Sequence, residues 1–233
     1  MTKLFLAVLM SIGTLGIAAT AAASEKPENI TEAEWALLPP YCPYTMGFKG
    51  HKQPHIAKWS GIMGEGFFHM HHYCWALIDL RRAERSGLPA TDRKFLRGRA
   101  LGGFQYVVRN APEDFVLAPE IYTWIGRTEI LLDRPKNAFE AFSTARQLKP
   151  DYWPPYYHWA EFLQSHGKRA EALEIIRSGL QFSPEAKSLL LLYRQLGGKP
   201  SDIPKPTAQV EAKSADENTG AEIGQDNDKP SVQ

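Results

Sequence analysis

The sequence lacks the short motifs that usually mark an enzyme or a metal centre. It contains no HExxH, CxxC or CxxCH pattern, and only two of its 233 residues are cysteine. These patterns place zinc, redox or haem ligands at fixed spacings, so none of the standard metal motifs is present. A GxSxG nucleophile turn is also absent, and the glycines of residues 61–66 do not match a phosphate-binding loop. We therefore expect no catalytic residues and no enzymatic activity.

The chain also lacks an excess of charge of one sign. It carries 27 lysine and arginine residues against 26 aspartate and glutamate residues, which gives a formal net charge of +1. A nucleic-acid-binding surface generally needs concentrated positive charge. The balance therefore argues against nucleic acid as a partner.

Long hydrophobic runs are missing except at the N-terminus. Lys3 precedes an apolar stretch over residues 4–17, and small alanines at 21–23 precede Ser24. This order is typical of a secretory signal peptide over residues 1–23. The run is shorter than the roughly 20 residues that a membrane span needs, so we expect no span after signal removal. No cysteine lies near the cleavage site, which excludes a lipid anchor there. A periplasmic or secreted protein is expected, with a retained N-terminal anchor as the alternative.

The two cysteines, Cys42 and Cys74, form an even count in a chain predicted to reach an oxidising compartment. Such a count favours a single disulfide between them. The bond would tie an N-terminal segment to the first long helix of the chain.

What the sequence does contain is a repeat with a period of 34 residues. Four residues are matched 34 positions later, namely Ala138, Phe142, Ala145 and Pro150 by Ala172, Ile176, Gly179 and Pro184. Three upstream residues, Tyr122, Ile125 and Gly126, recur in the same way as Tyr156, Trp159 and Ala160. This period, with small residues at fixed points and a closing proline, resembles the tetratricopeptide repeat (TPR), a unit of two helices. The resemblance covers roughly residues 91–196 and is clear only for about 119–186.

The resemblance implies an all-α fold, a short right-handed stack of helix–turn–helix repeats, over a helical domain at 67–198. Two units are expected over residues 119–152 and 153–186. The remaining predicted parts are a long helix over 67–85, a helix over 91–110, turns at 133–135 and 166–168, and a closing helix over 186–196.

The two ends of the chain are predicted to differ from this domain. Residues 24–66 are rich in glycine, proline, histidine and aromatic residues without clear periodicity, so we expect an irregular segment with one short helix. A capping box of Thr31 and Glu34 would begin that helix, and Pro39 would stop it. Residues 199–233 contain few large apolar side chains, so we expect a disordered tail.

A cluster of unusual residues lies just before Cys74. The run from His69 to Cys74 contains three histidines, and imidazole and sulfur are ligands for copper, zinc or haem iron. On a helix, His69 and His72 share one face, and His51, His55 or Cys42 could supply further ligands. The alternative is that these side chains pack against the irregular segment, with Cys74 in the disulfide. We favour packing, and so expect no cofactor, but a metal- or haem-delivery protein stays open as an alternative.

Aromatic residues gather where the second repeat unit begins. Within the TPR resemblance, the first helix of each unit lines a groove that binds a partner's peptide or helix, and aromatic side chains are frequent at such contacts. The predicted groove residues are Tyr122, Thr123, Trp153, Tyr156, Tyr157 and Trp159. Tyr156 and Trp159 occupy repeat positions that could instead be core, whereas Trp153 and Tyr157 lie off those positions.

These observations lead us to expect an exported adaptor or scaffold that binds another envelope protein or peptide segment during envelope assembly or secretion. Aromatic side chains also stack on sugar rings. A polysaccharide-associated factor is therefore a further alternative.

Overall fold

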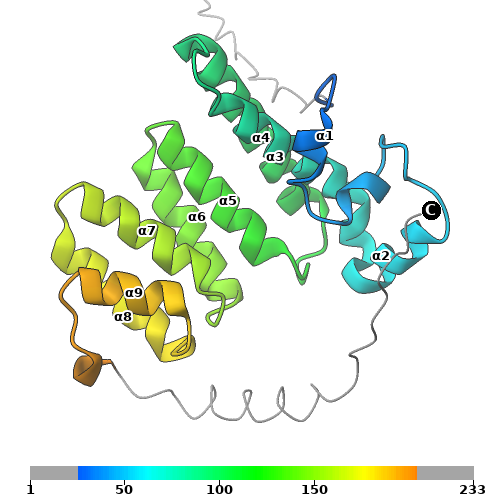
Figure 1. Ribbon diagram of the computed structural model, residues 1–233. Coiled ribbons are helices and arrows are strands. Elements are labelled where there is room, and N and C mark those ends of the chain that lie inside the picture. The colour runs from blue at the N-terminus through cyan, green and yellow to red at the C-terminus, as the bar shows by residue number, and fades with distance from the viewer. Residues whose placement is uncertain (1–25, 204–233) are drawn as a thin grey trace, which may run out of the picture.

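Helices account for the regular structure of this chain. The structure, a computed structural model, describes residues 26–203, and no strand occurs within that range. The predicted signal peptide and the part of the predicted tail beyond residue 203 lie outside the described residues. The α-helices in Figure 1 are α1 (Glu32–Trp35), α2 (His55–Met63), α3 (Met70–Ala83), α4 (Ala90–Asn110), α5 (Ala118–Leu131), α6 (Pro135–Leu148), α7 (Pro154–Ser165), α8 (Arg169–Phe182) and α9 (Lys187–Gln195). The predicted all-α class is confirmed.

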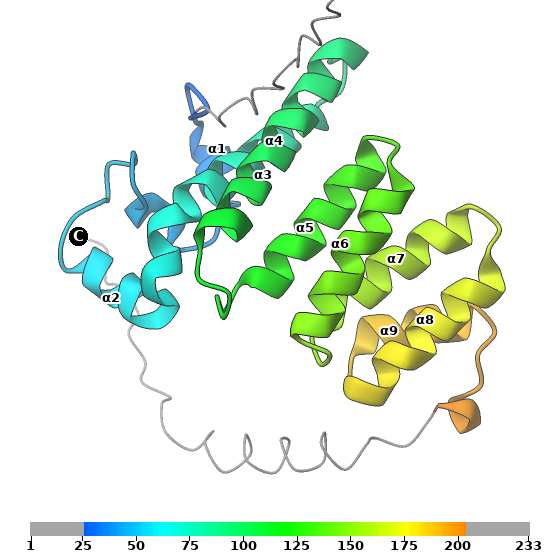
Figure 2. The ribbon, with the colours of Figure 1, turned by 180° about the vertical axis from the view of Figure 1, so that it is seen from behind.

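The helices from α3 onward pack in sequential antiparallel pairs. Helix α3 packs on α4, α5 on α6 and α7 on α8, and α9 closes the series by packing on α7 and α8 (Figures 1 and 2). The turns between paired helices lie where the sequence predicted them. Asp133 and Gly167 each have a positive φ there, of 59° and 74°, a conformation that glycine and aspartate tolerate better than most residues.

Small residues of the repeat allow the paired helices to approach closely. A Cβ atom on Gly126 of α5 would lie 2.7 Å from the Phe142 ring of α6. A Cβ atom on Gly179 of α8 would lie 2.8 Å from the Tyr156 ring of α7. Ala138 and Ala172, which occupy matching positions of the two units, are completely buried. The 34-residue pattern therefore reflects the packing of each pair.

The N-terminal segment is more helical than the sequence predicted. The expected short helix is present as α1, and its capping box is formed, since the Thr31 hydroxyl accepts from the Glu34 amide and the Glu34 carboxylate accepts from the Thr31 amide. Helix α2 was not expected. The long helix also begins later than residue 67, because a 3-10 turn over Gly64–His69 precedes α3. Gly66 permits this turn, since the Phe115 ring would lie 2.3 Å from any Cβ atom there.

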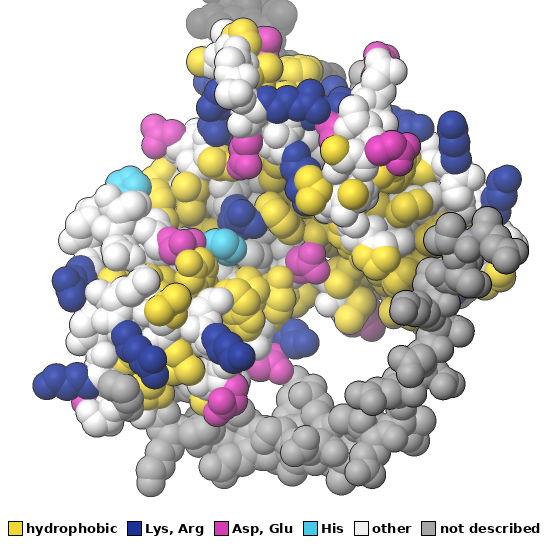
Figure 3. All heavy atoms as spheres, viewed as in Figure 1, with side chains coloured by type: hydrophobic (Ala, Val, Ile, Leu, Met, Phe, Trp, Pro, Cys, Tyr) yellow, Lys and Arg dark blue, Asp and Glu magenta, His cyan; other side chains and the backbone are white. Residues whose placement is uncertain are grey.

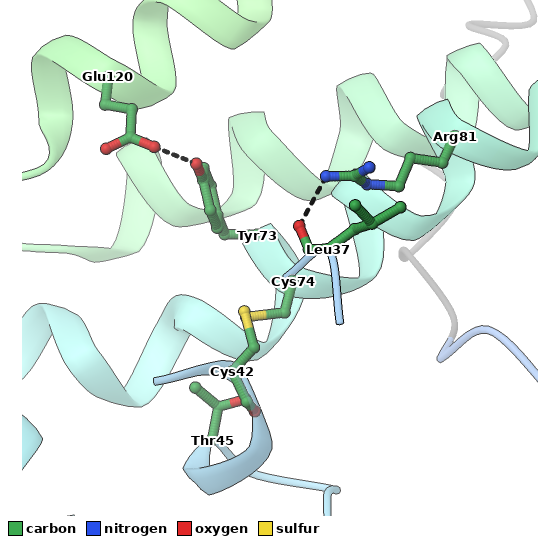
Figure 4. The surroundings of a disulfide bond; sticks show 7 residues. All are labelled: Leu37, Cys42, Thr45, Tyr73, Cys74, Arg81 and Glu120. Atoms are coloured by element: carbon green, nitrogen blue, oxygen red, sulfur yellow. Dashed lines mark hydrogen bonds between the residues drawn. A yellow bond between two sulfur atoms is a disulfide. The ribbon is translucent and has the colours of Figure 1, made fainter. Parts of the chain in front are cut away.

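A disulfide, a hydrogen bond and an ion pair between residues far apart in sequence hold this segment against α3. Cys42 and Cys74 form the predicted disulfide, with their Cα atoms 5.7 Å apart (Figure 4). Arg81 donates to the Leu37 carbonyl at 2.6 Å in the same view. Glu34 accepts from Arg82, and this pairing holds the pKa of its carboxyl down at about 2. The segment is thus fixed by covalent and charged contacts in addition to its buried side chains.

Candidate partner-binding face

The paired arrangement gives the stack two faces. Figure 1 views the side on which α9 lies in front of α8, and Figure 2 views the opposite side. We call the first side the odd-helix face, formed by α3, α5, α7 and α9. This is the face built from the first helix of each unit, where the sequence led us to expect the groove. Figure 3 shows hydrophobic side chains gathered across its middle, with a few charged and histidine side chains among them.

An aromatic row begins where α7 starts. The Trp153 and Tyr157 rings meet edge to face with centroids 6.0 Å apart, and the Tyr157 and His158 rings do the same at 5.4 Å. All three side chains are partly buried. Trp153 and Tyr157 pack against the core formed by α6 to α9. The row is therefore held in place from below while part of each ring remains accessible, as an aromatic contact surface requires.

Three of the predicted groove residues belong to the core instead. Thr123, Tyr156 and Trp159 retain only 4%, 4% and 8% of their exposure. The Thr123 hydroxyl donates to the carbonyl four residues earlier in its own helix, at 2.8 Å. Tyr156 fills the space over Gly179, and the Trp159 ring lies 6.0 Å from Phe142. Burial between the helices removes these side chains from the surface, which corrects the expectation that they contact a partner.

Tyr122 lies apart from the aromatic row. It is partly buried and lines a hollow of about 480 Å³ between α4, α5 and α6, together with Arg109, Glu129 and Thr144. These neighbours come from the even-numbered helices and from the side of α5 that faces them. The structure therefore places Tyr122 on the other side of the stack from the predicted groove. Of the six predicted residues, only Trp153 and Tyr157 lie next to each other with part of each ring accessible.

A cation that the sequence reasoning missed lies on the odd-helix face. The Arg127 guanidinium carbon is 4.2 Å from the centroid of the Trp124 ring, which is a cation–π contact. Both residues are on α5 and three positions apart, so helical spacing makes them neighbours. Burial lowers the pKa of Arg127 from its ordinary value, although arginine remains charged. Arg127 forms no hydrogen bond or ion pair with any residue in the described range.

Polar groups from three elements surround Arg127. Burial lowers the pKa of the His158 imidazole on α7, and the nearby Arg127 charge lowers it further. The His158 Nδ1 atom lies 3.2 Å from a carboxylate oxygen of Glu161. Burial raises the pKa of Tyr152, just before α7, so its phenol stays protonated. On the α3 side, the Tyr73 hydroxyl donates to Glu120 of α5 (Figure 4). The region therefore offers a cation, phenol groups and an imidazole within an aromatic setting.

The histidine cluster packs against α4 and the N-terminal segment. The His72 ring lies over Tyr106 of α4 with centroids 3.8 Å apart, and the His71 ring lies 4.3 Å from His72. The His71 Nδ1 atom bonds the Phe68 carbonyl at 3.0 Å. Burial, together with the neighbouring histidines, lowers the pKa of His72 to about 4. These rings are therefore neutral and mainly aromatic in character near pH 7.

The cluster does not assemble the ligands that the metal alternative required. His51 bonds the Tyr44 carbonyl through Nδ1 at 2.9 Å, and His55 stacks on the Tyr44 ring. Cys42 and Cys74 are oxidised to the disulfide. Within residues 26–203, no group of three or more histidine, cysteine, aspartate or glutamate side chains is placed to hold a metal ion. The His69 and His72 hypothesis thus gains no third ligand from this geometry.

The aromatic spacing in the sequence led to Trp153 and Tyr157 but not to the charged centre between them and α3. In the sequence, Trp124 and Arg127 look like any other tryptophan and arginine three positions apart on a helix. Their position on an outward face of α5 becomes visible only in the structure. The sequence feature that could have indicated this cation is an arginine one helical turn after a tryptophan on the first helix of a repeat.

Comparison with known proteins adds no further assignment. No family model, curated protein or solved structure matches this chain. None of the helices in residues 26–203 combines the length and apolar character needed to cross a membrane. The function of this chain is therefore inferred from its own sequence and geometry.

Proposed function

We propose that this chain is an exported TPR-type adaptor that binds a segment of another envelope protein on its odd-helix face. The observation that carries the proposal is the partly accessible aromatic row of Trp153 and Tyr157 at the start of α7. Figure 3 shows hydrophobic side chains gathered on the face that α7 helps to form. Large, rigid aromatic side chains bury much area at small entropic cost, and they dominate many protein interfaces. Such a row suits an extended or helical peptide better than a small polar substrate.

The repeat packing supports the TPR part of the proposal. Gly126 and Gly179 occupy points of close approach inside consecutive helix pairs, as small residues at fixed repeat positions require. Helical stacks of this kind present extended surfaces built from successive units. The disulfide supports export, since such bonds persist mainly in oxidising compartments.

A photo-crosslinking experiment tests the proposal in cells that export the full chain. A photoreactive phenylalanine analogue at position 157 should yield a discrete adduct with one envelope protein. The same analogue at position 95 serves as the matched control, because Phe95 is an exposed aromatic residue on α4. Trp153→Ala should reduce the adduct at 157 at least about fivefold, because removing one interface aromatic commonly costs more than 1 kcal/mol.

Two outcomes would contradict the adaptor proposal. Equal adducts from positions 157 and 95 would mean that the odd-helix face is not selective. An adduct with polysaccharide and none with protein would instead favour the sugar-binding alternative. Thermal unfolding of each variant checks that the stack remains folded.

A further inference from the structure

Arg127 differs from the other partly buried arginines of the described chain in lacking an acceptor. Arg82 pairs with Glu34 and Arg99 with Asp79, and Arg97 donates to the Leu131 carbonyl. Arg127 lies on Trp124 and makes no such contact with any residue between 26 and 203. Removing a charge from water is costly unless it is paired. A cation held in this way is available to an anion that arrives from elsewhere.

The surroundings favour a carboxylate as that anion. A guanidinium presents a planar fork of N–H donors that matches the two oxygens of a carboxylate. The Trp124 ring supports one side of Arg127 and orients it. The Tyr152 phenol is protonated near pH 7, as tyrosine ordinarily is, and can donate a further hydrogen bond. Of the two acidic side chains whose charges act on Arg127, Glu161 lies against His158, and Glu84 forms no hydrogen bond or ion pair with Arg127.

We propose that Arg127 binds a carboxylate of the chain's own C-terminal segment, residues 204–233, so that this segment docks on the odd-helix face. The segment carries six acidic residues and three lysines, so its charge complements the unpaired cation. This inference does not depend on the existence of a partner protein. If both proposals hold, the segment is a tethered competitor for the partner-binding face.

The start of the segment and its length permit the contact. Ile203, the last described residue, packs against the core formed by α6 to α9. Helix α9 packs on α7, and α7 on α5, so the path to Arg127 crosses two helix spacings, or about 20 Å. Glu211 follows Ile203 by eight residues, which span up to about 26 Å when extended. Glu211 and every later acid can therefore reach α5.

Limited proteolysis of the full exported, oxidised chain tests the docking. Trypsin cleavage after Lys213, followed by mass spectrometry, reports how often this part of the segment is free. Arg127→Gln should speed this cleavage about fivefold or more, because a charge-assisted bidentate contact is lost. Raising the salt concentration should speed cleavage of the unmodified chain in the same direction. Arg194→Gln is the matched control, since Arg194 is an exposed arginine in the last turn of α9, nearer to Ile203.

A second background separates docking from intrinsic cleavage preference. The six acids of 204–233 are replaced by glutamine or asparagine. In this background Arg127→Gln should no longer change the rate of cleavage after Lys213, even if the neutral segment is itself cleaved faster. An effect of Arg127→Gln on folding would persist in this background, so the comparison also separates docking from misfolding. Equal cleavage of the unmodified and Arg127→Gln chains would overturn the docking proposal. So would an equal effect of Arg127→Gln in the neutralised background. Neither result would affect the crosslinking test at position 157.

Discussion

The N-terminal region through α4 and the repeat region from α5 to α9 are stabilised in different ways. In the first, partners are far apart in sequence: Cys42 bonds Cys74 over 32 positions and Glu34 pairs with Arg82 over 48. In the second, ion pairs such as Arg177 with Glu174 span three positions on one helix. Exposed pairs of this local type contribute little to stability. Close helix packing therefore dominates the repeat region, whereas the N-terminal region adds a disulfide and long-range ion pairs to its buried core.

This difference shows why a helical repeat can be stable with few disulfides or long-range ion pairs. Each pair from α5 onward presents small residues where the next ring must fit, so the pattern that recurs in the sequence also defines the contacts. The segment before α3 has no such pattern, and short helices such as α1, with four residues, are not stable alone. Its position is set by a disulfide, a carboxylate and two arginines. Breaking one class of contact should therefore affect one region more than the other.

Reduction of the disulfide is expected to have the largest effect. Opening the Cys42–Cys74 loop should lower the free energy of unfolding by about 3–4 kcal/mol, because the unfolded chain regains the entropy of a closed loop of about 33 residues. Hydrogen exchange measured by mass spectrometry should show faster exchange in α1 and α2 than in the oxidised protein. Urea unfolding of both forms gives the change in free energy.

The control for this prediction is the repeat region itself. Exchange in α7 and α8 should change little on reduction if the two regions open separately. Cys42→Ala combined with Cys74→Ala should reproduce the reduced protein. A uniform rise of exchange across the whole chain would contradict the distinction between the regions.

The second prediction concerns Gly126, where close packing reverses an ordinary helix rule. Glycine-to-alanine changes inside helices usually stabilise by about 0.5–1 kcal/mol. Gly126→Ala should instead destabilise by about 1–3 kcal/mol, since the added methyl group would overlap the buried Phe142 ring. Thermal or urea unfolding measures the change.

Gly98 of α4 supplies the matched control. A Cβ atom there meets no neighbouring atom within 4 Å, so Gly98→Ala should follow the ordinary rule and stabilise the protein. If both substitutions stabilised the chain, the small residues of the repeat would not be points of close approach.

The repeat region could be predicted from the sequence because its period and its contacts coincide. The turns near Asp133 and Gly167 and the buried positions Ala138 and Ala172 all follow from the 34-residue spacing. Helix α2 could not be predicted in this way. It is short, lies between glycines and prolines, and owes its place to tertiary contacts such as the Tyr41 and Trp59 rings, 5.7 Å apart.

The binding face was only partly predictable for a related reason. Repeat register identifies which helix a residue occupies but not which way its side chain points between neighbours. Tyr156 and Trp159 were therefore predicted to line the groove although they are buried in the core. Arg127 was not predicted to lie on this face. Tyr122 was placed correctly on the first helix of a unit but faces α4 and α6. The residue types and their 34-residue period are enough to predict the helical stack. Which side chains lie on its surface and which in its interior depends on helix packing, which the period does not give.

The smallest expected effect is the pH dependence contributed by His72 in the N-terminal region. Its pKa of about 4 in the folded chain lies below the ordinary value of about 6.5 in the unfolded chain. The unfolded state therefore binds more protons between these values, so stability is full above about pH 7 and falls as the pH decreases toward 4. The loss from this group should be at most about 2 kcal/mol between pH 7.5 and 5.

His72→Phe isolates this contribution, because the substituted ring can still stack on Tyr106 but cannot titrate. The difference in unfolding free energy between the variant and the unmodified protein should change between pH 7.5 and 5, in favour of the variant at pH 5. His71, whose pKa burial also lowers, remains in both proteins, so the effect of its own burial is common to both. Glu34, with a pKa of about 2, loses its stabilising effect only below about pH 4.5 and does not interfere. A pH-independent difference would mean that water reaches His72 and that the ring is not held neutral by its packing against α4.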